Sequence, residues 1–194
     1  MVITEYTVDK KLDVKITAFA RETNQDISVS AAFQQVAIKN TTNKPIEAYF
    51  AFAFRPFNTE GISLINRLEF KDNGEVFINN KLAAVLMQIP HGVATSHLSK
   101  GDVQHYFDEA KSCEIADSGK SRVGMTSGIS IYKLELAPGK SASYEIRMPN
   151  NGKQLKKMKM KKNKIEIFAN YLRQDLFESI LAKETEQWQT KLSE

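Results

Sequence analysis

The 194-residue sequence contains one cysteine, Cys113, and one tryptophan, Trp188. A single cysteine excludes an internal disulfide framework and any metal cluster built from cysteines alone. No apolar run approaches the ~20 residues that a helix needs to cross a bilayer, so no membrane partner is expected. The N-terminus lacks a basic region followed by an apolar stretch, so there is no sign of a signal peptide, and the cytoplasm is the default expected location.

The motifs of common enzyme classes are also missing. The sequence has no phosphate-binding loop, no Gly-x-Gly-x-x-Gly, no Gly-x-Ser-x-Gly and no His-Glu-x-x-His. The spacing of His91, His97 and His105 matches no compact zinc pattern. Glu114 follows Cys113 directly, and a neighbouring acid disfavours the thiolate that a nucleophile needs. We therefore expect no catalytic residue, no metal site and no cofactor in this chain.

Positive charge is confined to one segment. The net charge is +4, but seven of the 27 basic residues and no acidic residue lie in Lys153–Lys164, so the rest of the chain carries −3. One hypothesis is an arm that binds nucleic acid or another anionic surface. The segment has no aromatic residue to stack on bases and no arginine to read guanine, which favours a solvated connector instead.

Alternating apolar and polar residues predict β-strands over most of the chain. The clearest is 142–148, where Ala142, Tyr144, Ile146 and Met148 share an apolar face and the residues between them are polar. The segment 46–54 is apolar on both faces, which predicts a central strand covered on both sides. Weaker alternation predicts five further strands, at 2–8, 12–18, 62–70, 75–78 and 82–89.

Turn signals connect several of these strands. Ala137–Lys140, with proline and glycine at its centre, predicts a hairpin between the strand ending at Leu136 and the strand at 142–148. Asn40–Pro45 predicts a second hairpin, and Asn73-Gly74 a third. Between His91 and Thr126 the periodicity fades, which predicts an irregular surface excursion with a helical turn around Val103–Ala110.

The C-terminal part changes from strand to helix periodicity. Leu172, Leu176, Ile180 and Leu181 recur at helical spacing from about residue 170. An amphipathic helix must bury this apolar stripe, either by folding back on the sandwich or by leading into a further domain. The predicted fold is therefore mostly β: a large antiparallel β-sandwich with a C-terminal amphipathic helix.

The segment Phe54–Gly61 is the most distinctive candidate site. Its Arg55, Phe57, Asn58 and Glu60 present a guanidinium, an aromatic ring, an amide and a carboxylate. A sugar site uses this combination, because a flat apolar face covers the ring and planar polar groups bind hydroxyls. The structural alternative is that Phe57 packs inward while Arg55 and Glu60 pair to brace the loop.

The sequence resembles the N-terminal β-supersandwich domain of bacterial six-hairpin glycosidase-like proteins, relatives of glucoamylase and glycogen-debranching enzymes. The resemblance spans residues 30–192 and rests on short segments: Val36–Ile46, Arg55–Gly61, Lys100–Val103, Ser127–Lys140 and Gln187–Leu192. It implies a supersandwich that precedes an (α/α)6 helical toroid holding the catalytic acids.

The predicted organisation is a β-sandwich domain at 1–152, a lysine-rich connector at 153–169 and a C-terminal linker helix at 170–194. The resemblance implies a non-catalytic accessory domain of a carbohydrate-active, glycoside hydrolase-like protein. Its expected partner is a helical catalytic domain of the parent protein that lies outside this sequence. One alternative is a self-standing carbohydrate-binding module with Arg55, Phe57, Asn58 and Glu60 at its site. A further alternative is an adaptor for nucleic acid or an anionic surface.

Overall fold

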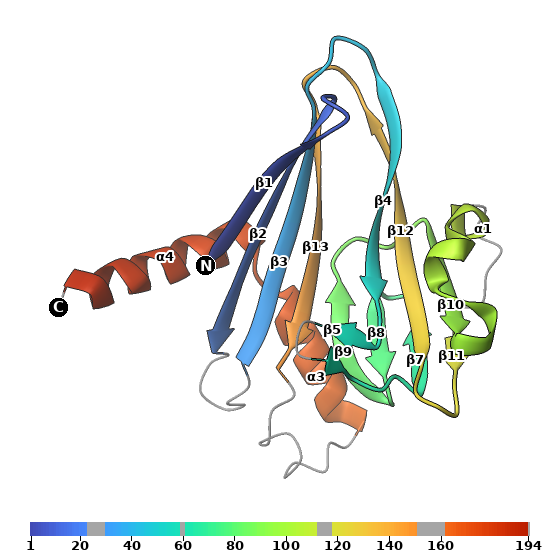
Figure 1. The fold of residues 1–194 in the computed structure, drawn as a ribbon. Helices are drawn as coiled ribbons and strands as arrows, with labels where there is room; N and C mark the ends of the chain where they lie inside the picture. Colours follow the sequence, from blue (N-terminus) through green and yellow to red (C-terminus); the bar gives the residue numbers. More distant parts are fainter. Residues whose placement is uncertain (23–29, 59–60, 112–117, 151–161, 194) are drawn as a thin grey trace.

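The structure is a computed structural model that describes residues 1–22, 30–58, 61–111, 118–150 and 162–193. Strands dominate these residues, and two antiparallel sheets pack face to face as a β-sandwich (Figure 1). Helices lie on the outer face of each sheet. The predicted mostly-β sandwich with C-terminal helical structure is confirmed.

The larger sheet, sheet A, contains eight strands in the order β1-β2-β3-β13-β9-β8-β7-β11. All of its neighbours pair antiparallel. Its strands are β1 Val2–Val8, β2 Leu12–Glu22, β3 Ser30–Asn40, β7 Arg67–Phe70, β8 Glu75–Ile78, β9 Lys81–Leu86, β11 Ser118–Lys120 and β13 Ser141–Pro149.

The smaller sheet, sheet B, has the order β10-β12-β4, and a two-stranded ladder, β5-β6, leaves its end. These strands are β4 Ile46–Phe54, β5 Phe57–Asn58, β6 Gly61–Ile62, β10 Gly92–His97 and β12 Thr126–Leu136. The helical segments are η1 Leu98–Lys100, η2 Val103–Tyr106, α1 Phe107–Lys111, α3 Lys162–Arg173 and α4 Phe177–Ser193.

Three apolar clusters hold these layers together. The main core lies between the sheets, where Tyr132 of β12 and Tyr144 of β13 meet with ring centroids 4.6 Å apart. A second cluster joins the outer face of sheet A to α3 and α4 through Phe19, Phe33 and Phe177. A third joins the outer face of sheet B to η2 and α1. Leu172 and Ile180 of the predicted amphipathic stripe are thus buried against the sandwich, whereas Leu176 is 76% exposed.

Two predicted hairpins are wrong, because both connections cross between the sheets. β12 pairs with β10 and β4, whereas β13 pairs with β3 and β9. The turn at 137–140 therefore links two sheets, as does the turn at 41–45 between β3 and β4. A period-2 pattern defines which residues share a face, and the apolar faces of β12 and β13 meet across the core instead of side by side.

Asn40 holds these two sheet-crossing turns together. Its side chain is fully buried, and its Nδ2 donates to the carbonyls of Lys44 at 2.7 Å and Leu136 at 3.0 Å. Its backbone amide donates to Lys140 O, and its carbonyl accepts from Gly139 N. Through its side chain and its backbone, Asn40 thereby links the turn at 41–45 to the turn at 137–140.

Other strand predictions divide into confirmed and corrected ones. β1 and β8 have the predicted bounds, and β7 and β8 form the predicted hairpin around Gly74. The strand expected at 62–70 is limited to Ile62 in β6 and Arg67–Phe70 in β7. β4 contacts an apolar cluster on each face but lies at the edge of sheet B instead of its centre, and Phe52 is the one buried residue of the strand.

The two remaining segments also differ from the prediction. The region 91–126, predicted to be irregular, contains strands β10 and β11 as well as the predicted helical turn at η2 and α1. The C-terminal part forms two helices rather than one, and α3 begins at Lys162 within the range assigned to the connector. The division of the chain into domains remains a prediction.

Candidate functional site

Arg55 follows β4 and contacts a turn distant in sequence. Its Nη2 donates to Asp102 Oδ1 at 2.9 Å and to Gln104 Oε1 at 3.3 Å. Asp102 caps the N-terminus of η2, since its Oδ1 also accepts from the Gln104 backbone amide at 2.9 Å. The guanidinium is therefore engaged in joining the end of β4 to η2.

The ionisation of Asp102 reflects these contacts. Partial burial of the carboxyl acts to raise its pKa, but the hydrogen bond from the Gln104 amide and the Arg55 guanidinium outweigh it. The net result is a pKa below the ordinary value of the carboxyl. The Asp102 side chain is thus a carboxylate at neutral pH. It serves as a structural anchor for Arg55 and has no proton to donate.

Replacing Arg55 by methionine should raise the pKa of Asp102, because one of the groups that favour the carboxylate is lost. We expect a stability loss of about 0.2–1 kcal/mol, since this ion pair is partly exposed. In the native chain the lowered pKa of Asp102 stabilises the folded state at pH values above the ordinary pKa of aspartate. This contribution is lost as the pH falls through the folded-state pKa. Carboxyl NMR titration of both proteins checks this, and an unchanged Asp102 pKa would contradict it.

Of the other predicted site residues, the structure describes Phe57 and the backbone of Asn58. Phe57 lies in β5 with its side chain 55% exposed, and Asn58 pairs through the backbone with Gly61. The inward packing of Phe57 considered as an alternative is therefore wrong. Glu60 lies outside the described residues, so the predicted Arg55–Glu60 pair stays untested.

Phe57 belongs to an exposed apolar surface that we call the β5–β6 patch. Its members are Phe57, Ile62, Leu64 and Val123, and each side chain is between 55% and 62% exposed. Phe57 and Ile62 are directly opposite in the β5–β6 ladder, so they point to the same face. Exposed apolar side chains that lie close together mark interaction surfaces more often than single exposed ones do.

The frame of the β5–β6 patch is held by hydrogen bonds. Ser63 N donates to Pro56 O at 2.8 Å, and Ile65 N donates to Gly124 O at 2.7 Å. Gly124 has a φ of +75°, and a Cβ at this position would lie 2.7 Å from Leu64 Cβ. The glycine thus lets Leu64 lie directly on the loop that carries Val123.

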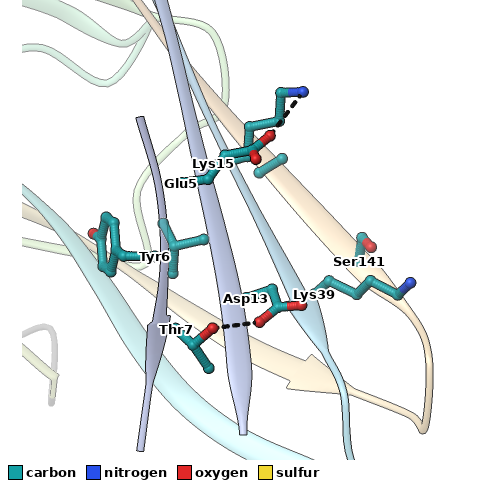
Figure 2. Close-up of a pocket in the computed structure, with 9 residues that line it drawn as sticks. Glu5, Tyr6, Thr7, Asp13, Lys15, Lys39 and Ser141 are labelled. Carbon is teal, nitrogen blue, oxygen red and sulfur yellow. Dashed lines mark hydrogen bonds and ion pairs between the residues drawn. The ribbon is translucent and has the colours of Figure 1, made fainter. Parts of the chain in front are cut away.

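A shallow polar groove of about 530 Å³ lies on the outer face of β1, β2, β3 and β13 (Figure 2). A Glu5–Lys15 ion pair at 3.1 Å and a hydrogen bond from Thr7 Oγ1 to Asp13 Oδ1 at 2.8 Å cross it. Figure 2 shows Tyr6 pointing away from these charged side chains. The groove therefore offers charged groups of both signs, with Tyr6 as its one aromatic lining residue, which is typical of solvated sheet surface.

The groove and the Arg55 segment lie at opposite ends of the strands. Lys39 and Ser141, which line the groove, adjoin the two sheet-crossing turns, whereas Arg55 follows the other end of β4. The structure therefore does not combine them into one site.

Two histidines contact neighbouring loop groups. His91 Nε2 lies 3.0 Å from Lys111 O, and His97 Nδ1 lies 2.9 Å from Ser99 Oγ. Among the described residues no group of three or more His, Cys, Asp or Glu side chains is arranged to hold a metal ion. Cys113 falls outside the described residues, as does most of the lysine-rich segment.

A buried ion pair that the sequence patterns did not single out fixes the C-terminal helices. Arg147 and Glu145 of β13 are 1% and 7% exposed, and Arg147 Nε donates to Glu145 Oε1 at 2.6 Å. The guanidinium also donates to the carbonyl of Leu172 in the last turn of α3 and to the carbonyl of Asp175, two residues after this helix ends. A cation at a helix C-terminus is favourable because it satisfies free carbonyls and complements the helix dipole.

Additional polar contacts surround this ion pair. Arg173 pairs with Glu75 at 3.3 Å, and Arg21 pairs with Glu184 at 3.1 Å. Together with Arg147, they attach both helices to sheet A. Both helices therefore pack on the outer face of sheet A.

No protein-family model matches the chain, and no curated protein matches it. The resemblance to glycosidase-associated supersandwich domains therefore stays a prediction. No helix in the described part of the chain is both long and apolar enough to span a membrane.

Proposed function

We propose that the chain is a non-catalytic β-sandwich domain of a carbohydrate-active, glycoside hydrolase-like protein. In this proposal the β5–β6 patch packs against the helical catalytic domain of the same protein. The exposure of these four apolar side chains, which lie on neighbouring segments, is the observation that carries the proposal. The sandwich fold and the sequence resemblance support the choice of partner.

The composition of the β5–β6 patch favours a protein partner over a sugar. Ile62, Leu64 and Val123 are aliphatic, so they bury apolar area but provide neither a flat stacking face nor hydrogen bonds. The Arg55 guanidinium next to the patch is already engaged by Asp102 and Gln104. Glycan binding through Arg55 and Phe57 consequently has less support.

Photo-cross-linking in the product of the complete reading frame tests the proposal. Phe57 is replaced by benzoyl-phenylalanine, which keeps an aromatic ring at the centre of the patch, and we expect cross-links to helical residues that follow this sequence. The same replacement at Leu176, which is 76% exposed at the corner between α3 and α4, is the control and should give few such cross-links.

Equal yields at positions 57 and 176 would contradict the proposed packing surface. A reading frame that ends at Glu194 would contradict the proposed partner.

A further inference from the structure

The strand β1 forms an exposed edge of sheet A (Figure 1). All seven of its residues are exposed, and its apolar side chains Val2, Ile3, Tyr6 and Val8 are between 42% and 65% exposed. Val2, Tyr6 and Val8 belong to the face of sheet A that points toward sheet B, because they pair with Ala18, Val14 and Leu12. Three strands of sheet B are too few to cover all of this face, so β1 extends beyond them.

This edge lacks the features that normally prevent sheets from pairing. β1 contains no proline and no lysine, and it pairs with β2 in one continuous register without a bulge. Its only charged residue, Glu5, is paired with Lys15 on the outer face. A long, regular, apolar edge strand of this kind is a template for another strand.

We propose that this edge docks a second copy of the same chain, with the two β1 strands antiparallel across a two-fold axis at Thr4. The sequence of β1 is complementary to itself, which favours a second copy as the partner and one register of pairing. With Thr4 opposite Thr4 of the second copy, each Val2 lies opposite a Tyr6 on the same face. Each Glu5 then lies opposite an Ile3.

The neighbouring register is disfavoured by charge. An axis at Glu5 would pair all seven residues, but it would place two carboxylates directly opposite each other. The axis at Thr4 avoids this contact and keeps each Glu5 beside the Lys15 of its own chain, 3.1 Å away. The self-complementary pairing is isologous, so it closes as a dimer and sheet A continues as one sheet through both copies.

Sedimentation over a concentration series up to about 1 mM tests the association, because pairing through one strand is expected to give a dissociation constant between about 1 µM and 1 mM. The 194-residue chain should shift from monomer to dimer across this range. Tyr6→Lys should weaken dimerisation at least about tenfold, since it removes an apolar pair and places lysine on the edge. A chain that stays monomeric at every concentration would overturn the proposal. This outcome is also the one expected if β1 instead pairs with a strand of another protein.

Cysteine cross-linking tests the register. In a Cys113→Ser background, Thr4→Cys should form a disulfide-linked dimer on mild oxidation, because paired Cα atoms lie about 5 Å apart. Val8→Cys is the matched control on the same face. Its two copies would be separated by about 27 Å along the strands and should not cross-link.

Cross-linking at Val8→Cys as readily as at Thr4→Cys would overturn the register. Unchanged circular dichroism and melting temperature of the reduced variants show that the chains compared are folded.

Discussion

Replacing Arg147 by methionine should cost about 3–5 kcal/mol of folding free energy, the largest effect expected for any ion pair in the described structure. Methionine fills much of the space of the arginine stem but provides no donors. Glu145 would then be a buried acid without its cation, and the carbonyls at the end of α3 would lose their partner. Urea unfolding of both proteins measures the difference.

The loss caused by Arg147→Met should depend on pH. Burial already raises the pKa of Glu145, while Arg147 opposes the rise, so removing Arg147 should raise this pKa further. A folded-state pKa above the unfolded value means that stability falls as the pH rises from the ordinary glutamate pKa through the raised one. The variant should therefore be least stable, relative to the native chain, above this window.

Two further variants separate the buried ion pair from ordinary surface charge. Glu145→Gln combined with Arg147→Met should recover part of the loss, because no unpaired charge is left buried. Arg173→Gln, which breaks a more exposed pair, should cost about 1 kcal/mol or less. A loss below about 1 kcal/mol for Arg147→Met would show that this contact does not hold the helices.

Gly128→Ala should destabilise the chain by about 3 kcal/mol through overpacking of the core. Gly128 lies in β12 on the face toward sheet A, where a Cβ would be 2.0 Å from Leu68 Cδ2 and 3.2 Å from Ala94 O. Leu68 is fully buried, so it has little room to move. The change should appear in urea unfolding as a lower midpoint with an unchanged slope.

Gly139→Asn provides the matched control for Gly128→Ala. Gly139 has a φ of +71° and no atom within 4 Å of an added Cβ, so substitution meets backbone strain but no steric clash. Asparagine tolerates this conformation, and the expected cost is about 1 kcal/mol or less. Equal losses for the two variants would contradict tight packing between the sheets as the cause.

The alternation of side chains predicted the faces of the strands but not their neighbours. Ala142, Tyr144, Ile146 and Met148 do face the main core, as their spacing predicts. The partner of this strand could not be predicted, because the same alternation fits a strand beside β12 and a strand opposite it. The buried Asn40, which links the two sheet-crossing turns, resembles an ordinary turn residue in the sequence.

The polar face of β13 shows why burial could not be predicted locally. Glu145 and Arg147 alternate with apolar residues, a pattern typical of a solvent-facing side. In the structure α3 and α4 cover this side, and Arg147 becomes almost fully buried. The carbonyls that Arg147 binds are 25 and 28 positions away in the sequence, so only the tertiary arrangement shows the contact.

The carbohydrate site predicted at Arg55, Phe57, Asn58 and Glu60 stays a prediction. Phe57 is exposed, as a binding residue would need to be, but Arg55 is held by Asp102 and Gln104. The partners of Arg55 come from a turn 47 and 49 residues away, which no local spacing indicates. The alternation of Ile62 and Leu64 after Gly61 was the one available signal for the rest of the β5–β6 patch, whereas Val123 becomes part of it only through the position of Gly124.

Hydrogen–deuterium exchange tests most directly whether the β5–β6 patch packs against a helical domain. Exchange is compared between the 194-residue chain and the product of the complete reading frame, with the β1–β2 turn at residues 9–11 as a reference segment. Packing predicts slower exchange at residues 61–64 and 121–125 in the longer protein and no change in the reference segment. Equal exchange at the patch in both proteins would contradict the proposed function.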